Sequence, residues 1–167
     1  YLILELEFVW DIFKKKKIHN NTAFYLQNPS ALDPSLAPEG KSAIYVLVPV
    51  ANNSSGINWE KHKTEYRNLI IKLITQRIPE LADLETCIEE EKIITPDNWQ
   101  NDYNVFFGAT FNLAHNLTQM LYFRPRNRFE ELDNCYLVGG GTHPGSGLPT
   151  IYESARISVN LFTGLNI

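Results

Sequence analysis

The stretch Tyr136-Leu-Val-Gly-Gly-Gly-Thr-His-Pro-Gly-Ser-Gly-Leu-Pro-Thr-Ile-Tyr-Glu-Ser154 predicts a short apolar strand, a glycine-rich turn and a helix that opens on Pro149. Glycines let the backbone turn tightly, and they let a ligand approach without interference from Cβ. The free amides and the dipole at the start of the helix favour a negative charge, such as a phosphate. The pattern alone leaves two interpretations open, a cofactor-binding turn and a purely structural turn.

Neither of the two common nucleotide-binding motifs fits this turn. A dinucleotide fingerprint needs Gly-x-Gly-x-x-Gly, and after Gly139 and Gly141 the third position is Pro144. A P-loop ends in Gly-Lys-Ser/Thr, whereas Gly145 is followed by Ser146. The turn therefore has the setting of a cofactor loop without matching either motif.

The composition describes a globular chain that is long enough for one domain with a sizeable core. It has 167 residues, of which 44% are hydrophobic, and 15 basic against 19 acidic residues give a net charge of −4. This balance predicts no broad basic surface, so nucleic acid is not expected as a partner. Cys87 and Cys135 lie far apart without histidines at ligand spacing, which predicts neither a metal site nor a disulfide framework. A reduced, cytoplasmic protein is expected.

The first residues predict a helix rather than a targeting or membrane-spanning segment. Acidic residues interrupt the first apolar run, and residues 3–13 carry apolar side chains at helical spacing. The chain begins at Tyr1 rather than at methionine, as expected for a piece of a longer protein. Lys14–Lys17, next to Trp10 and Phe13, fit either a solvated helix end or a peripheral membrane contact.

Two strands and a long helix are expected next. Residues 23–28 and 43–50 are rich in aromatic and β-branched side chains, and a loop containing prolines and a glycine separates them. Asn58 is expected to cap a helix from Trp59 to about Ile78, with a single apolar stripe, and Pro79 is expected to stop it.

The pattern is weaker beyond this helix. Thr86–Thr95 alternates enough to predict a third strand, and residues 96–100 predict a short helical turn. Residues 101–132 are rich in apolar side chains without a clean period, which fits either a lipid-sized cavity or ordinary core. A last helix is expected over Thr150–Phe162, with its end near Gly164. Its expected buried residues are Ile151, Ala155, Val159 and Phe162.

Several segments together resemble the bacterial-type phytoene desaturases. The glycine-rich stretch at 136–149 is similar to the C-terminal flavin-binding segment of that family. The same resemblance is carried by Asn28-Pro29-Ser30, by Asp33-Pro-Ser-Leu-Ala-Pro-Glu-Gly-Lys41, by Tyr45-Val-Leu-Val-Pro-Val50 and by Tyr122-Phe-Arg-Pro-Arg-Asn-Arg128. It covers most of residues 8–163 in order.

The resemblance implies the C-terminal third of an FAD-dependent oxidoreductase that removes hydrogens from phytoene or a related carotenoid. The implied fold class is α+β. Residues 1–134 would form a mixed-sheet part of a substrate-binding domain with packed helices. Residues 135–163 would form the C-terminal strand, turn and helix of an FAD-binding domain, and residues 164–167 a tail. The dinucleotide fingerprint for the FAD pyrophosphate is missing, so the isolated chain is expected to be inactive and to bind flavin weakly or not at all.

The resemblance also implies which residues contact FAD. Gly139 to Thr142 would lie near the ribityl chain and phosphate, and Gly147, Leu148 and Pro149 near the flavin ring. Many amine-oxidase relatives carry Asp or Glu where this chain has Gly140, which leaves backbone contacts at that position. The full predicted set is Gly139, Gly140, Gly141, Thr142, His143, Gly145, Gly147, Leu148 and Pro149.

Catalytic residues and the reaction itself are less determined. The candidates for a general base are His115, His143, Asp33 and Glu153, and each also has an ordinary structural interpretation. Arg124, Arg126 and Arg128 fit either a contact with an anionic group or surface pairs with Glu130, Glu131 and Asp133. The alternatives to a desaturase are a non-catalytic module and a related flavoprotein, such as a carotenoid isomerase, a carotenoid oxidase or a retinoid saturase.

Overall fold

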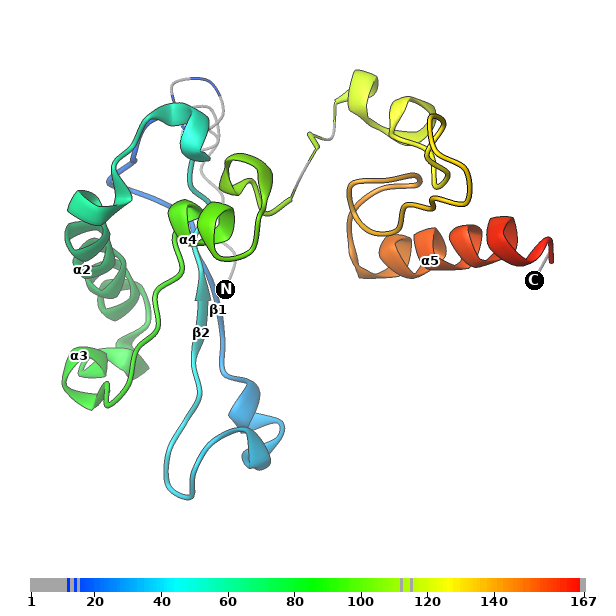
Figure 1. Cartoon of the computed structure of the whole chain (residues 1–167). Coiled ribbons are helices and arrows are strands. Elements are labelled where there is room, and N and C mark those ends of the chain that lie inside the picture. Colours follow the sequence, from blue (N-terminus) through cyan, green and yellow to red (C-terminus); the bar gives the residue numbers. More distant parts are fainter. Residues whose placement is uncertain (1–11, 13, 15, 112, 115, 166–167) are drawn as a thin grey trace. The chain divides into compact units, whose positions relative to one another are not determined.

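The computed structural model describes residues 12, 14, 16–111, 113–114 and 116–165, and it divides into two compact units, Tyr1–Gly108 and Ala109–Ile167 (Figure 1). The helix expected over 3–13 lies almost wholly outside the described residues, as do Trp10 and Phe13. The expected domains, 1–134 and 135–163, remain a prediction, and residues 109–134 belong to the same unit as the turn. The 3₁₀ turns cover Pro29–Ala31, Pro34–Leu36, Asn53–Ser55, Pro79–Leu81, Phe106–Gly108, Leu117–Gln119 and Leu121–Phe123.

The first unit is built on an antiparallel hairpin. Strands β1 (Tyr25–Gln27) and β2 (Tyr45–Leu47) pair with Leu26 opposite Val46, so both expected strands are confirmed in shortened form. The connection is ordered by Ser30, whose hydroxyl donates to Asn28 Oδ1 at 2.7 Å and accepts from the Ala43 amide at 3.0 Å. These bonds close the proline-containing loop at its base.

Helix α2 (Trp59–Arg77) confirms the strongest element predicted from the sequence. The Asn58 side chain accepts a hydrogen bond from the Lys61 amide at 3.1 Å, which caps the helix. Residues on one stripe of α2 are buried together with Phe24, and partly buried residues of the hairpin pack against them. The buried members of this core are Phe24, Trp59, Tyr66, Ile70, Ile74, Ile78 and Leu84.

The prediction of a strand over Thr86–Thr95 is wrong. Helix α3 (Leu84–Cys87) occupies its first part, and residues 88–95 form no strand. Arg67 of α2 bonds Glu85 at 2.7 Å and Glu91 at 3.0 Å, so this segment follows the helix rather than an edge of the sheet. Helix α4 (Pro96–Asn101) then begins at a capping box formed by Thr95 and Asn98, which confirms the expected short helical turn.

The second unit consists of loops on helix α5 (Leu148–Thr163), which ends at Gly164 with φ 70° as expected. The strand expected before the turn is reduced to a single bridge between Arg128 and Tyr136. Large apolar side chains from the stretch 101–132 are exposed in both units and do not form ordinary core; they include Phe106, Phe111, Leu117, Tyr122 and Phe123. None of the described helices is long and apolar enough to cross a membrane.

Candidate functional site

The turn before α5 needs glycine at three positions. Gly139, Gly145 and Gly147 have φ of 119°, 155° and 104°, a range that L side chains rarely adopt. Gly147 is also the N-cap of α5, so no side chain caps this end of the helix, and Pro149 lies in its first turn. The sequence therefore produces a tight turn that leads into an uncapped helix start.

A buried cluster of polar side chains holds the turn on α5. Ser154 is fully buried, and its Oγ accepts hydrogen bonds from the Gly139 amide at 3.1 Å and from Asn127 Nδ2 at 2.9 Å. Thr142 Oγ1 lies 2.8 Å from Ser154 Oγ and donates to the Gly139 carbonyl at 2.9 Å. Asn127, Thr142 and Ser154, which we call the polar cluster, thus join three segments that are distant in sequence.

Further bonds extend this attachment on both sides of the turn. The Leu137 amide donates to the Asn127 carbonyl at 2.8 Å, and Ser158 Oγ donates to the Leu137 carbonyl at 2.7 Å. The His143 amide donates to the Pro125 carbonyl at 2.8 Å. The backbone from Leu137 to His143 is therefore fixed at both ends by bonds to the segment 125–127.

Two successive amides of the turn remain open. The amides of Gly139, Thr142 and His143 are all used within the unit. The amides of Gly140 and Gly141, by contrast, have no hydrogen-bond partner among the residues that the structure describes. Successive free amides are donors to phosphate and other anions. We call Gly140 N–H and Gly141 N–H the amide pair.

Arg124 does not form the surface ion pair expected from its acidic neighbours in sequence. It is 2% exposed, and its Nε donates to the Gly140 carbonyl at 3.1 Å, as does Nη2. Its Nη1 donates to the Gln119 carbonyl at 2.8 Å. The expected pairing holds for Arg126, which is exposed and lies 3.7 Å from Glu130.

The described candidates for a general base fit structural roles. Asp33 caps the turn Pro34–Leu36, and hydrogen bonds from Ser35 hold the pKa of its carboxyl below the usual value. A hydrogen bond from Arg156 likewise lowers the pKa of Glu153, so both carboxylates are poor proton acceptors. His143 is held in the turn by its amide, and the peptide bond between it and Pro144 is cis. His115 lies outside the described residues.

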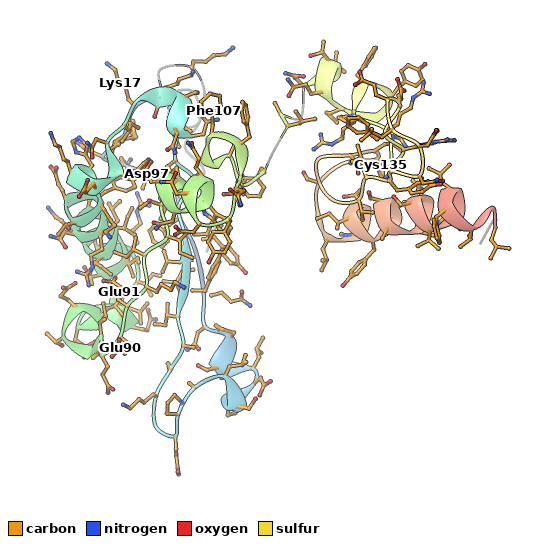
Figure 2. All side chains as sticks on the ribbon, viewed as in Figure 1. Lys17, Glu90, Glu91, Asp97, Phe107 and Cys135 are labelled. Carbon is orange, nitrogen blue, oxygen red and sulfur yellow. The ribbon has the colours of Figure 1, made fainter. Side chains whose placement is uncertain are left out.

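Helix α5 differs in part from the helix expected from its sequence: Ile151 and Ala155 are half-buried, but the most buried positions are not the expected apolar ones. Its buried side chains are Ser154 and Ser158, whereas Val159 and Phe162, expected inside, are 50% and 71% exposed. The loops of the unit, among them the segment of Cys135, lie over one side of α5 (Figure 2). Small hydroxyl side chains therefore face the turn, and much of the apolar surface of the helix faces outward.

The structure brings most of the predicted site residues into one loop. Residues 139–143 lie against the polar cluster, Gly145 and Gly147 precede α5, and Leu148 and Pro149 are the first two residues of that helix. Asn127 and Ser154 were missed as parts of the site, and Arg124 was named only as one of three arginines that fit a contact with an anionic group. The serines Ser154 and Ser158, four residues apart and therefore on one face of the helix, were the available signal for a polar inner face. No group of three or more metal-ligating side chains occurs among the described residues.

No family model matches the chain, but curated relatives do. The 4,4'-diapophytoene desaturase (4,4'-diapolycopene-forming) of a Methylomonas species is 58% identical over 153 residues, which are 92% of this chain and 30% of that protein. The all-trans-zeta-carotene desaturase of Myxococcus xanthus is 42% identical over 84% of this chain and 26% of that protein. A phytoene desaturase (neurosporene-forming) of Rhodobacter capsulatus is 37% identical over 90% of this chain and 29% of that protein. The chain thus spans about 30% of the length of these relatives, and the predicted resemblance is confirmed.

Proposed function

We propose, from its homology to carotenoid desaturases, that this chain contributes the C-terminal part of an FAD-dependent desaturase of phytoene or a related carotenoid. Three relatives with this class of activity in their names match 84% to 92% of the chain. In this proposal the turn 139–149 forms part of the FAD site, and the remaining part of the cofactor is bound by the portion of the enzyme that this chain does not span.

The single observation that carries the cofactor assignment is the amide pair. Gly140 and Gly141 offer two adjacent donors, and the uncapped start of α5 follows a few residues later. Both features favour an anionic group, and FAD carries phosphates as well as a ring that becomes electron-rich on reduction. A turn whose backbone amides were all hydrogen-bonded within the protein would offer no donors to the anionic groups of this cofactor.

The glycines also leave room for a close approach. A Cβ at Gly139 or Gly145 would meet no atom within 4 Å, so glycine is not required there by crowding within the chain. The positive φ of these two residues explains part of the requirement for glycine. A cofactor that lies directly against the backbone would explain why no protein atom occupies the space beside them. The polar cluster keeps this backbone in one conformation, which is the contribution expected from a protein that positions a cofactor.

When bound, FAD supplies the acceptor for the hydrogens that a desaturase removes from a polyene. The residues of this chain bind and orient that cofactor through the turn, and the helix start stabilises negative charge by about 0.3–2 kcal/mol. We assign no general base to the chain, because the described carboxylate candidates have lowered pKa values and structural partners.

The decisive experiment joins this chain to the portion that it does not span. In a chimera, the 153 matched residues replace the matched segment of the Methylomonas desaturase, and the purified protein is examined for flavin absorbance and for desaturation of diapophytoene. We expect bound FAD and a product whose absorption has moved into the visible. A correctly folded chimera without flavin would refute the cofactor assignment. Bound flavin with isomerised, oxygenated or saturated products would instead favour a related flavoprotein activity.

A further inference from the structure

Arg124 is a buried cation that has no acidic partner in the part of the chain that the structure describes. Its side chain is 2% exposed, and no carboxylate lies within ion-pair distance of it among the described residues. A buried charge is costly unless hydrogen bonds or an opposite charge compensate it. Here the carbonyls of Gly140 and Gln119 supply the hydrogen bonds, so the donors are engaged while the net charge is not neutralised.

These bonds fix the direction of the amide pair. A trans peptide group is planar, and its C=O and N–H point in opposite directions. Because Arg124 holds the Gly140 carbonyl, the Gly141 amide of the same peptide group is directed away from the guanidinium. Thr142 acts in the same way one peptide earlier, since its amide and hydroxyl hold the Gly139 carbonyl at 3.1 and 2.9 Å and direct the Gly140 amide away.

We propose that Arg124 is a positioning residue of the cofactor site, an inference that rests on the proposed FAD function. Its guanidinium orients the peptide between Gly140 and Gly141, and its positive charge raises the electrostatic potential around that peptide group. Both effects favour an anionic ligand on the amide side. Among the described residues, the hydrogen bonds of Arg124 go to backbone carbonyls, so it acts through the turn.

The roles of geometry and charge can be separated by two substitutions. Arg124→Lys keeps the positive charge but replaces the planar fork, which bonds Gly140 twice, by a single ammonium group. Arg124→Gln keeps a donor of shorter reach and removes the charge. Arg126→Gln is the matched control, because Arg126 lies two residues away, is exposed and pairs with Glu130 at the surface.

The test uses the chimeric desaturase described above, loaded with FAD. Affinities for oxidised and reduced flavin are measured for each variant by reconstitution of the deflavinated protein, and folding is checked by circular dichroism. We expect Arg124→Lys to lower the affinity for oxidised FAD at least threefold and Arg124→Gln at least tenfold. We also expect Arg124→Gln to lower the ratio of reduced to oxidised affinity at least fivefold, and Arg126→Gln to change neither quantity by more than twofold.

The outcomes distinguish the inference from the function on which it rests. If the unsubstituted chimera folds without binding FAD, the proposed function fails and the inference falls with it. If that chimera binds FAD and both Arg124 variants match it within twofold, the function stands and the inference is overturned. For Arg124→Gln, an affinity loss with an unchanged ratio of reduced to oxidised affinity would reduce Arg124 to a structural anchor and would also overturn the inference. If Arg124→Gln does not fold, the affinity of Arg124→Lys for oxidised FAD decides: a loss of at least threefold supports the inference, and a smaller loss overturns it.

Discussion

Replacing Ser154 with alanine should loosen the turn by removing the acceptor at the centre of the polar cluster. The Oγ atom accepts bonds from the Gly139 amide and Asn127 Nδ2, at 3.1 and 2.9 Å; Asn127 is buried and Gly139 is half-buried. An unsatisfied buried donor costs about 1–3 kcal/mol. Asn127 keeps weaker contacts, such as the one to the Leu137 carbonyl at 3.3 Å, so the loss should be concentrated on Gly139.

The expected loss is about 2 kcal/mol of the free energy that keeps the turn closed. Alanine has a better helix propensity than serine, by up to about 0.7 kcal/mol, so an effect of this sign cannot come from the helix itself. The matched control is Ser158→Ala on the same buried face. Ser158 Oγ donates to the Leu137 carbonyl, which also accepts from Asn127, so this change should cost only about 0.5–1.5 kcal/mol.

Amide hydrogen exchange measured by NMR gives the free energy of local opening directly. For Ser154→Ala we expect the Gly139 amide to exchange about 30-fold faster, because 1.4 kcal/mol corresponds to about a factor of ten. We expect amides in the middle of α2, which belongs to the other unit, to keep their rates. A change below threefold at Gly139, or one equal to that of Ser158→Ala, would refute the claim that Ser154 holds the turn.

Three further outcomes follow from the geometry. Gly147→Ala should destabilise the start of α5 by about 1–3 kcal/mol, because the N-cap residue has φ 104° and ψ 143°. Gly140→Ala should be tolerated, because the added Cβ would lie 3.4 Å from Ser146 Cβ. Equal amide exchange rates in the first turn of α5 for the two variants would contradict this expectation. Asn58→Ala should lower the stability of the first unit by about 1 kcal/mol in urea unfolding followed by tryptophan fluorescence, with an unchanged slope; an unchanged midpoint would count against the cap. The Glu153 carboxyl should titrate below its usual range in an NMR pH series, because a hydrogen bond from Arg156 lowers its pKa. The contribution of this pair to the stability of α5 is therefore present above the ordinary pKa of Glu153 and is lost as pH falls through the lowered pKa. Arg156→Gln should move the titration midpoint of Glu153 upward.

Local signals explain what could be predicted from the sequence. Helix α2 has an Asn58 cap, a stripe at helical spacing and a proline after its end, so three independent features agree. The end of α5 at Gly164 follows from the same kind of signal, a glycine that adopts a left-handed conformation. The hairpin was predictable because the turn-forming residues of its connection separate two apolar runs.

The errors arise where the deciding partner is distant. Thr86–Thr95 has a weak alternation, but the segment lies against α2 because Arg67 bonds both Glu85 and Glu91. Arg124 was expected to pair with nearby acidic residues, yet its partners are backbone carbonyls. Because every residue has a backbone carbonyl, the sequence does not indicate which of them accepts the bond. Only the folded turn reveals that bond.

The exposure of Val159 and Phe162 on α5 has a related cause. The apolar residues of α5 were predicted to be buried because removing apolar surface from water is favourable. In this unit the small serines allow the helix to lie close to the turn, and the buried side chains of the described part of the unit are polar. The unit therefore gains its single conformation from hydrogen bonds more than from apolar packing.

The depth of Arg124 also determines how the turn responds to salt. Dissolved ions screen exposed charges over a Debye length of about 8 Å at physiological ionic strength, but they screen a buried charge much less. A site that attracted anions through surface lysines would lose that preference in concentrated salt. This turn should retain it, because the guanidinium is covered by protein on nearly all its surface and ions cannot approach it.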